Sequence, residues 1–177
     1  VRERFIYYRA YLLNNNYNLD NILLVDSKDV IFQKDPFPLI ESLNKDLILV
    51  SEGMKHSQSE WNKEDQRKFQ ENLYKFNISY DNWSIVNGGT IIGKTKAIIA
   101  LCQTVWLCHL TSNQNSTEQA VLNYLTKYLL EDKDNIVVEP QTTNLALTGE
   151  AIKSGLINPQ IIDNKVVCPS NKEPYCL

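Results

Sequence analysis

The sequence predicts a single α/β domain with a mainly parallel sheet and helices on both of its faces. Short apolar runs bounded by turn-forming residues alternate with segments of helical periodicity, which is typical of strands joined by crossover helices. The runs are continuously apolar, as in strands that are buried on both faces. A length of 177 residues suits one domain. Because the chain begins inside an amphipathic pattern, we expect it to be a fragment of a longer protein.

The elements are expected in a definite order along the chain. Helices are predicted over 4–13, 39–43, 95–110 and from Ser116 onward, with a further short helix between 138 and 164. Strands are predicted over 21–25, 47–50, 90–93, 136–138 and near 164–167, the last as a strand or hairpin, and residues 84–86 lead into Asn87, Gly88 and Gly89. Residues 55–72 are polar and indicate a partly helical surface excursion, with Trp61 and Phe69 as isolated apolar anchors and His56 in a polar loop.

Composition narrows the classes of function. The net charge is −3 and Lys and Arg form no block, so no nucleic-acid partner is expected, because duplex binding requires a basic face. No transmembrane segment is expected either, since no apolar stretch reaches the roughly 18 residues of a spanning helix. Of the four cysteines, Cys168 and Cys176 can close a small loop or remain free thiols.

The strongest local signal is the segment LLVDSKDVIFQKDPF, residues 23–37. Asp26 and Asp29 follow a buried strand, and in open α/β sheets ligands bind beyond the carboxyl ends of the strands. Two carboxylates this close repel each other unless a cation lies between them, and oxygen ligands suit Mg²⁺ or Mn²⁺. The alternative is that both are solvated turn residues that cap local backbone. Asp35, before Pro36, is expected to cap the next turn.

Two further segments carry side chains suited to a ligand. In VNGGTIIG, residues 86–93, adjacent glycines at a loop-to-strand junction let the backbone approach a ligand, and Asn87 adds an amide; an ordinary turn is the alternative. In STEQAVLNYL, residues 116–125, Glu118 and Gln119 stand at the start of a helix. Taken alone, that pair is better explained by a capping box or by the helix dipole.

Together, and in this order, the three segments resemble the GT-A glycosyltransferases of the retaining glycogenin and bacterial galactosyltransferase type. The likeness is strongest to a branch whose metal motif is Asp-x-x-Asp followed by Val-x-Phe-Gln, here Asp26 to Gln33. The resemblance implies a GT-A fold and transfer of a sugar from a nucleotide-sugar, a UDP-sugar in this family, to a glycan, lipid or protein acceptor that the sequence does not identify. It also implies a cytoplasmic protein if bacterial and a secretory-lumen protein if eukaryotic.

The resemblance further implies roles for individual residues. Asp26 and Asp29 would bind Mn²⁺ or Mg²⁺ and, through it, the donor diphosphate. The donor site would be completed by Arg4, Ser27, Gly88 and Gly89, and the catalytic residues beside the transferred sugar would be Asn87, Glu118 and Gln119. The family usually has Asp at the position of Glu118, which is one methylene longer.

Two departures from the family pattern concern the ends of the chain. The family's nucleotide-binding first strand would precede Val1, and its third metal ligand, a His after the last strand, would follow Leu177. The chain has two histidines, His56 and His109, and neither occupies that position. His109 ends a predicted helix, where it suits the helix dipole.

Two other classes of function are open at this point. A haloacid-dehalogenase-type phosphatase also places an Asp after a buried strand, but its Asp-x-Asp spacing is one residue shorter than that of Asp26 and Asp29. A catalytically incompetent remnant of the transferase fold would bind nucleotide or metal through the same two acids, or bind neither. Titration with Mn²⁺ and a nucleoside diphosphate separates the three.

Overall fold

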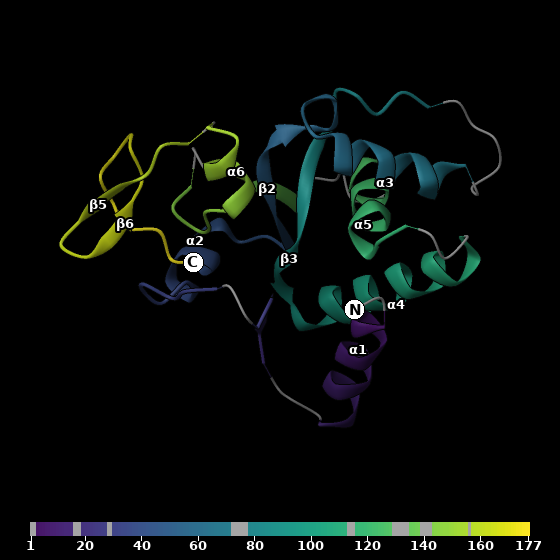
Figure 1. The fold of residues 1–177 in the computed structure, drawn as a ribbon. Helices are drawn as coiled ribbons and strands as arrows, with labels where there is room; N and C mark the ends of the chain where they lie inside the picture. Colours follow the sequence, from purple (N-terminus) through teal and green to yellow (C-terminus); the bar gives the residue numbers. More distant parts are fainter. Residues whose placement is uncertain are drawn as a thin grey trace.

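The computed structural model describes residues 3–15, 19–27, 30–71, 78–112, 116–128, 135–138, 143–155 and 157–177. A four-stranded sheet forms the centre of the fold, and a two-stranded hairpin lies to one side (Figure 1). The helices are α1 (Arg4–Asn14), α2 (Phe37–Leu43), the 3₁₀ turn η1 (His56–Gln58), α3 (Glu60–Gln70), α4 (Thr95–Thr111), α5 (Glu118–Tyr128) and α6 (Gly149–Lys153). The strands are β1 (Asn21–Val25), β2 (Leu47–Lys55), β3 (Ser84–Lys94), β4 (Asn135–Val138), β5 (Gln160–Ile162) and β6 (Lys165–Val167).

Three strands of the described sheet run in one direction, but β3 lies between two of them and runs the other way. The order is β1-β3-β2-β4; β3 is antiparallel to β1 and β2, and β2 is parallel to β4. The prediction of a mainly parallel sheet is therefore wrong for the pairing of neighbours. A continuous apolar run reports burial of both faces, and an antiparallel strand covered on both faces produces the same run. The carboxyl ends of β1, β2 and β4 still lie at one edge, where β3 begins.

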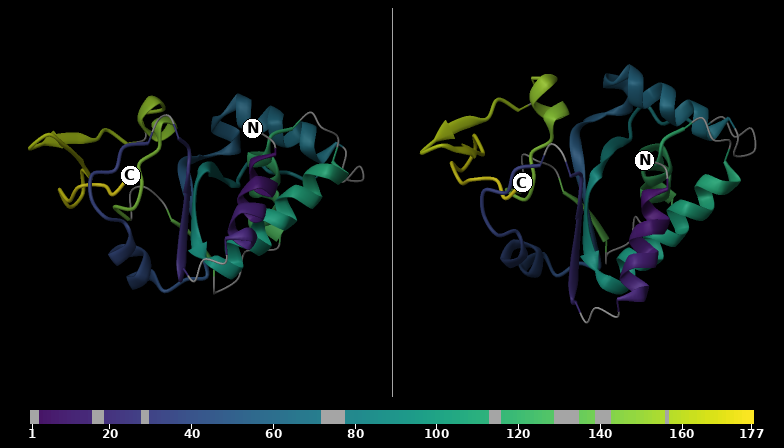
Figure 2. Two further views of the ribbon diagram at one scale, coloured as in Figure 1. Left: turned by 90° about the horizontal axis from the view of Figure 1, so that it is seen from below. Right: turned by 60° about the horizontal axis from the view of Figure 1, so that its bottom comes forward.

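Helices cover both faces of the sheet. Figure 2 shows α1, α3, α4 and α5 on one side, and α2, α6 and the β5–β6 hairpin on the other. Side chains alternate between the faces along each strand: Leu47 and Leu49 belong to the larger core, and Ile48 and Val50 to the smaller one. The larger core also contains Phe5, Leu12, Phe69, Ile98, Leu101, Val105, Val121 and Leu125. No described helix is both long and apolar enough to cross a membrane.

The residues Asn87, Gly88 and Gly89 lie inside a strand and not at a loop-to-strand junction, so that part of the prediction is wrong. β3 runs unbroken through all three, although its register with β2 shifts on either side of Ser51. Asn-Gly and Gly-Gly pairs also form turns. Here they lie between residues 90–94, which pair with β1, and Val86, which pairs with Ser51 of β2, and paired strand on both sides keeps the segment extended. Irregular pairing leaves backbone groups available to side chains.

Two residues between 55 and 72 have environments opposite to the predicted ones. Trp61 is exposed on α3, whereas Phe69 is buried as expected. His56 is buried, with its ring edge-on to Tyr80 and Trp83 and its Nδ1 3.2 Å from the Trp83 carbonyl oxygen. Burial lowers the pKa of His56. The prediction of a surface excursion is also wrong for one side of α3, because four of its polar residues are buried with Phe69: Asn62, Asp65, Gln66 and Gln70.

The C-terminal segment forms a hairpin and a tail. β5 and β6 pair antiparallel, which confirms the hairpin. Cys168 and Cys176 are buried free thiols. The Leu177 N–H donates to the Leu145 carbonyl oxygen, and the Leu147 N–H donates to the Leu177 carbonyl oxygen. The tail therefore lies along residues 145–147, on the sheet face that carries the smaller core.

Close packing at the end of β3 can be tested at Gly93. A Cβ atom there would lie 2.5 Å from the Asp46 carbonyl oxygen and 3.3 Å from the Leu47 Cα, so the backbone would have to move. We expect Gly93→Ala to lower the free energy of unfolding by about 2 kcal/mol, a typical overpacking cost, in urea denaturation followed by circular dichroism.

Gly149→Ala is the matched control for this substitution. Nothing lies within 4 Å of the position of its Cβ, and alanine is the better helix former at the first residue of α6. The control should be neutral or slightly stabilising. Equal destabilisation by the two substitutions would contradict the packing argument.

Candidate functional site

The carboxyl end of β1 meets the glycines of β3. The Asp26 N–H donates to the Gly89 carbonyl oxygen at 2.9 Å, which extends the pairing of the two strands by one residue. The Asp26 carboxylate lies over Gly89: a Cβ on that glycine would be 2.9 Å from the Asp26 Cγ and closer still to Oδ2. A residue without a Cβ therefore allows the carboxylate to rest against the strand.

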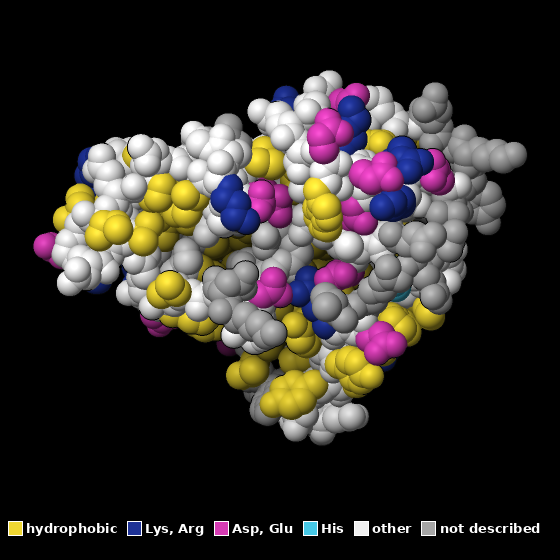
Figure 3. All heavy atoms as spheres, viewed as in Figure 1, with side chains coloured by type: hydrophobic (Ala, Val, Ile, Leu, Met, Phe, Trp, Pro, Cys, Tyr) yellow, Lys and Arg dark blue, Asp and Glu magenta, His cyan; other side chains and the backbone are white. Residues whose placement is uncertain are grey.

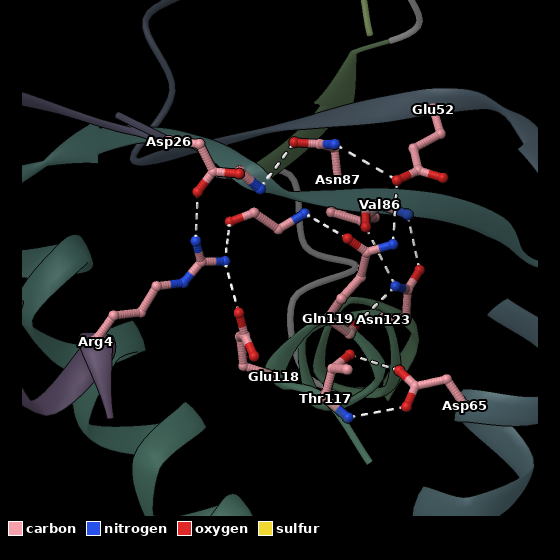
Figure 4. A network of polar contacts seen from close by, with 12 residues as sticks. Arg4, Asp26, Glu52, Asp65, Val86, Asn87, Thr117, Glu118, Gln119 and Asn123 are labelled. Carbon is pink, nitrogen blue, oxygen red and sulfur yellow. Dashed lines mark hydrogen bonds and ion pairs between the residues drawn. The ribbon is translucent and has the colours of Figure 1, made fainter. Parts of the chain in front are cut away.

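Arg4 joins the start of α1 to β1, β3 and α5. Its Nη1 donates to Asp26 Oδ1 at 2.6 Å, and its Nη2 donates to the Gly88 carbonyl oxygen at 2.6 Å and lies 2.9 Å from Glu118 Oε1 (Figure 4). The two acids differ in exposure, because 8% of the Glu118 side chain is exposed and 47% of the Asp26 side chain. The buried pair, which water screens less, holds Arg4 in place, while Asp26 keeps access to solvent.

Gln119 holds the other backbone group of Gly88. Its Oε1 accepts from the Gly88 N–H at 3.0 Å, and its Nε2 donates to Glu52 Oε1 at 3.1 Å and to Asn62 Oδ1 at 2.8 Å. A Cβ on Gly88 would lie 3.2 Å from Arg4 Nη2 and 3.3 Å from Gln119 Oε1. Glycine thus lets two side chains close in on one residue of β3 from different elements.

Glu52, which belongs to no recognised motif, is a buried acid in this network. It lies near the carboxyl end of β2 and is 4% exposed. Besides the bond from Gln119, it accepts from Asn87 Nδ2 and from Asn62 Nδ2, each at 3.4 Å. Burial raises the pKa of Glu52 and outweighs the amide hydrogen bonds, which lower it. The sequence signal for this residue is slight: it is an acid two positions after the apolar run 47–50.

The start of α5 is anchored to α3 and to β3. Asp65 on α3 accepts from the Thr117 N–H at 2.9 Å and from the Thr117 hydroxyl at 2.5 Å. Asn123 accepts from the Val86 N–H at 2.7 Å and donates to the Val86 carbonyl oxygen at 3.2 Å. Hydrogen bonds therefore hold the chain at Thr117, just before α5, and at Asn123. Glu118 and Gln119 lie between these two points, so their positions relative to the sheet are fixed.

A cavity of about 370 Å³ lies beside the network. Its wall on the sheet is polar and is formed by Asp26, Asn87, Gly89 and Thr90. Its opposite wall is largely apolar and is formed by Val30, Ile31, Gln33, Ala146, Leu147, Thr148, Gly149, Ile152, Asn164, Val166, Tyr175 and Leu177. Figure 3 shows hydrophobic side chains gathered between α6 and the β5–β6 hairpin, on the same side of the molecule. The size and mixed lining are typical of a small-molecule site.

Gln33, part of the motif that follows the two acids, connects that motif to the C-terminal segment. Its Nε2 donates to the carbonyl oxygens of Val166 at 3.1 Å and Tyr175 at 3.2 Å, and its Oε1 accepts from the Val166 N–H at 2.6 Å. The side chain thereby fixes the far wall of the cavity. Asp35 accepts from the Phe37 N–H at 3.0 Å, which confirms the predicted cap.

The structure gathers most of the residues that the motifs indicated. One hydrogen-bonded network contains Arg4, Asp26, Asn87, Gly88, Gly89, Glu118 and Gln119. Among the described residues, Asp26, Asn87 and Gly89 line the cavity. Arg4 contacts the lining at Asp26, whereas Glu118 contacts Arg4 and Gln119 contacts Gly88, one step further from the cavity. Ser27 is exposed just beyond Asp26, and Asp29 lies outside the described residues.

The chemistry of Asp26 suits a hard cation. Its Oδ1 accepts from Arg4, and in the described part of the chain Oδ2 is left without a hydrogen bond. Carboxylate oxygens are the ligands that Mg²⁺ and Mn²⁺ prefer. No group of three His, Cys, Asp or Glu that could hold a metal occurs among the described residues. The predicted Asp26–Asp29 metal site, half of which lies outside them, stays a prediction.

The ion pair of Arg4 with Glu118 can be tested by removing first the cation alone and then both charges. Arg4→Met leaves a buried carboxylate without its cation, and we expect the free energy of unfolding to fall by about 2 kcal/mol, the N-terminus of α5 offsetting part of the cost. In Arg4→Met/Glu118→Gln no buried charge remains, and about half of the loss should return. Urea denaturation measures both variants. Equal losses in the single and double variants would rule out the buried pair as the stabilising contact.

Comparison with known proteins supplies a family for this arrangement. A family model described as nucleotide-diphospho-sugar transferase matches residues 6–177, nearly the whole chain, with Arg4 just before the matched region. A search of curated proteins and a search of solved structures each found no match. The extent of the family match decides the assignment: the chain belongs to the nucleotide-diphospho-sugar transferase family.

Proposed function

We propose that this chain transfers a sugar from a UDP-sugar to an acceptor hydroxyl, with Mn²⁺ or Mg²⁺ bound by Asp26 and Asp29. The observation that carries the proposal is the place of Asp26, at the end of β1 and on the polar wall of a cavity that Asn87 and Gly89 also line. The nucleotide-sugar donor follows from the family; the uridine base, the metal and the residue roles are the proposal.

The metal would lie at the exposed carboxylate of Asp26. That side chain keeps one oxygen outside the bond to Arg4, and Asp29 would supply a second carboxylate. When bound, a divalent cation supplies Lewis-acid stabilisation of the charge on the departing diphosphate. Arg4 adds a fixed positive charge at the same end of the cavity, because the buried pair with Glu118 prevents it from swinging away.

We assign Asn87, Glu118 and Gln119 to the end of the site nearest the transferred sugar. Asn87 lines the cavity itself. Glu118 acts on the cavity through Arg4, and Gln119 acts on it through Gly88. Such groups are already oriented before the sugar–phosphate bond breaks, which is the condition for electrostatic stabilisation without reorganisation. Retention of the anomeric configuration belongs to the proposal through the resemblance to the glycogenin type.

The alternatives now have unequal support. Membership of the transferase family argues against the haloacid-dehalogenase-type phosphatase. A remnant of the fold that binds nucleotide but transfers nothing has the same contacts as an active enzyme, so an assay separates them. Release of UDP from a panel of UDP-sugars in the presence of Mn²⁺, with water as the acceptor, is the simplest one. Diphosphate binding without any release would favour the remnant.

The assignment of Asp26 can be tested by titration of UDP in the presence and absence of Mn²⁺. We expect the wild-type chain to bind UDP only with the metal, and Asp26→Asn to weaken this binding by at least about tenfold, since a neutral amide is a poor ligand for a hard cation. Asp29→Asn should do the same.

Asp46→Asn is the matched control for the titration. Asp46 is half-exposed before β2 and pairs with Lys94, at the opposite end of the sheet. Its substitution should leave metal-dependent binding unchanged. Unaltered binding in both Asp26→Asn and Asp29→Asn would remove the metal site from the proposal.

A further inference from the structure

We propose that Glu52 is a positioning residue of this site, whose carboxylate sets the direction of the Gln119 and Asn87 amides and thereby the place of Gly88 and Gly89. Its effect on turnover rests on the proposed transferase function, whereas its effect on the two glycines does not. Glu52 lies on β2, across β3 from Asp26, so it acts on the site from the side opposite the predicted metal.

The direction of each amide is set from both of its ends. A backbone N–H can only donate, so the Gly88 N–H requires the oxygen of Gln119 and the Gly89 N–H requires the oxygen of Asn87. The NH₂ groups of both side chains then point the other way and need an acceptor. An ionised carboxylate only accepts, and Glu52 Oε1 receives both NH₂ groups, at 3.1 and 3.4 Å.

Asn62 gives a second reason why position 52 requires a carboxylate. Its Oδ1 accepts from Gln119, and its Nδ2 donates to Glu52 Oε2. A neutral amide at position 52 would turn an NH₂ group toward Asn62 or toward Gln119. Flipping Asn62 to meet it would turn the NH₂ group of Asn62 toward that of Gln119. Because Glu52 and Asn62 are both buried, water cannot readily supply the missing acceptor.

The directions of the Gln119 and Asn87 amides affect the cavity through Gly88 and Gly89. Gly88 is held by Gln119 at its N–H and by Arg4 at its carbonyl oxygen. Gly89 carries the Asp26 carboxylate against its Cα. A change in the direction of the Gln119 amide therefore moves Gly88, on which Arg4 rests, and a change in that of Asn87 moves Gly89, on which Asp26 rests. Burial makes the Glu52 charge unfavourable for stability, as expected of a group retained for geometry.

Amide hydrogen exchange measured by NMR tests the structural part. Glu52→Gln keeps the shape of the side chain and removes a buried charge, so we expect it to fold. The Gly88 and Gly89 amides should exchange about tenfold faster than in the wild type, the effect of about one lost hydrogen bond. Unchanged exchange at both glycines would overturn the proposal.

Two further variants make the exchange experiment decisive. Glu64→Gln is the same chemical change at a half-exposed position on α3, and it should leave both glycine amides unaffected. Glu52→Asp retains the charge with a shorter reach and should give a smaller increase in exchange than Glu52→Gln. If Glu52→Gln does not fold, Glu52→Asp is compared with the wild type in its place. Exchange of Gly88 and Gly89 in Glu52→Asp at the wild-type rate would then count against the proposal.

Kinetics test the link to the reaction. We expect Glu52→Gln to lower kcat by about tenfold or more while the metal-dependent Kd for UDP changes by less than about threefold, because the diphosphate end lies at Asp26. In an Asn87→Ala/Gln119→Ala background, Glu52→Gln should lower kcat little further, since both amides through which it acts are gone. Additive effects would overturn the positioning role. A wild-type chain that neither binds UDP with metal nor releases it from a UDP-sugar refutes the proposed function instead, and the exchange result still decides on Glu52.

Discussion

The close approach of side chains to the backbone of β3 at Gly88 and Gly89 is the constraint on which the rest of the site depends. Arg4 and Gln119 reach the two backbone groups of Gly88 from α1 and α5, and Asp26 at the end of β1 lies on Gly89. A Cβ at either glycine would occupy the space these groups use. Two consecutive elements, α1 and β1, and the distant helix α5 are therefore placed relative to one another by two residues without side chains.

The acids of the site are stabilised in different ways, and their exposure follows from this. Glu118 is buried and is paired with a guanidinium. Glu52 is buried too, but its hydrogen bonds come from side-chain amides, which do not offset its desolvation, so that its pKa is raised. Asp26 shares Arg4 with Glu118 and remains about half exposed. Of the acids in the described chain, it is the one that faces the cavity.

The cavity has two walls of different origin. The polar wall comes from the sheet edge, where strand ends bring carboxylate and amide groups together. The largely apolar wall comes from the segment after the acidic motif and from the C-terminal residues, which Gln33 ties together through three hydrogen bonds. One short motif thus contributes a side chain to each wall: Asp26 to the polar wall, and Gln33 to the contacts that hold the other. In the proposed transfer, charged parts of the donor belong at the first wall.

Most of the helices and strands, and the motif residues that belong together, can be predicted from the sequence, although β3 was expected to be interrupted at Asn87 to Gly89. The apolar run 47–50 specifies a strand that is buried on both faces, whereas in the run 21–25 only Ile22 is buried. The three motifs also indicate Asp26, Asn87 and Gln119 as residues of one site. The direction of a strand could not be predicted from the sequence, because burial of both faces produces the same apolar run in a parallel and in an antiparallel strand. The antiparallel direction of β3 and the place of Glu52 in the site result from long-range packing. Of the three side-chain amides that bond to Glu52, two lie 35 and 67 residues further along the chain, and no local pattern records a contact made over that separation.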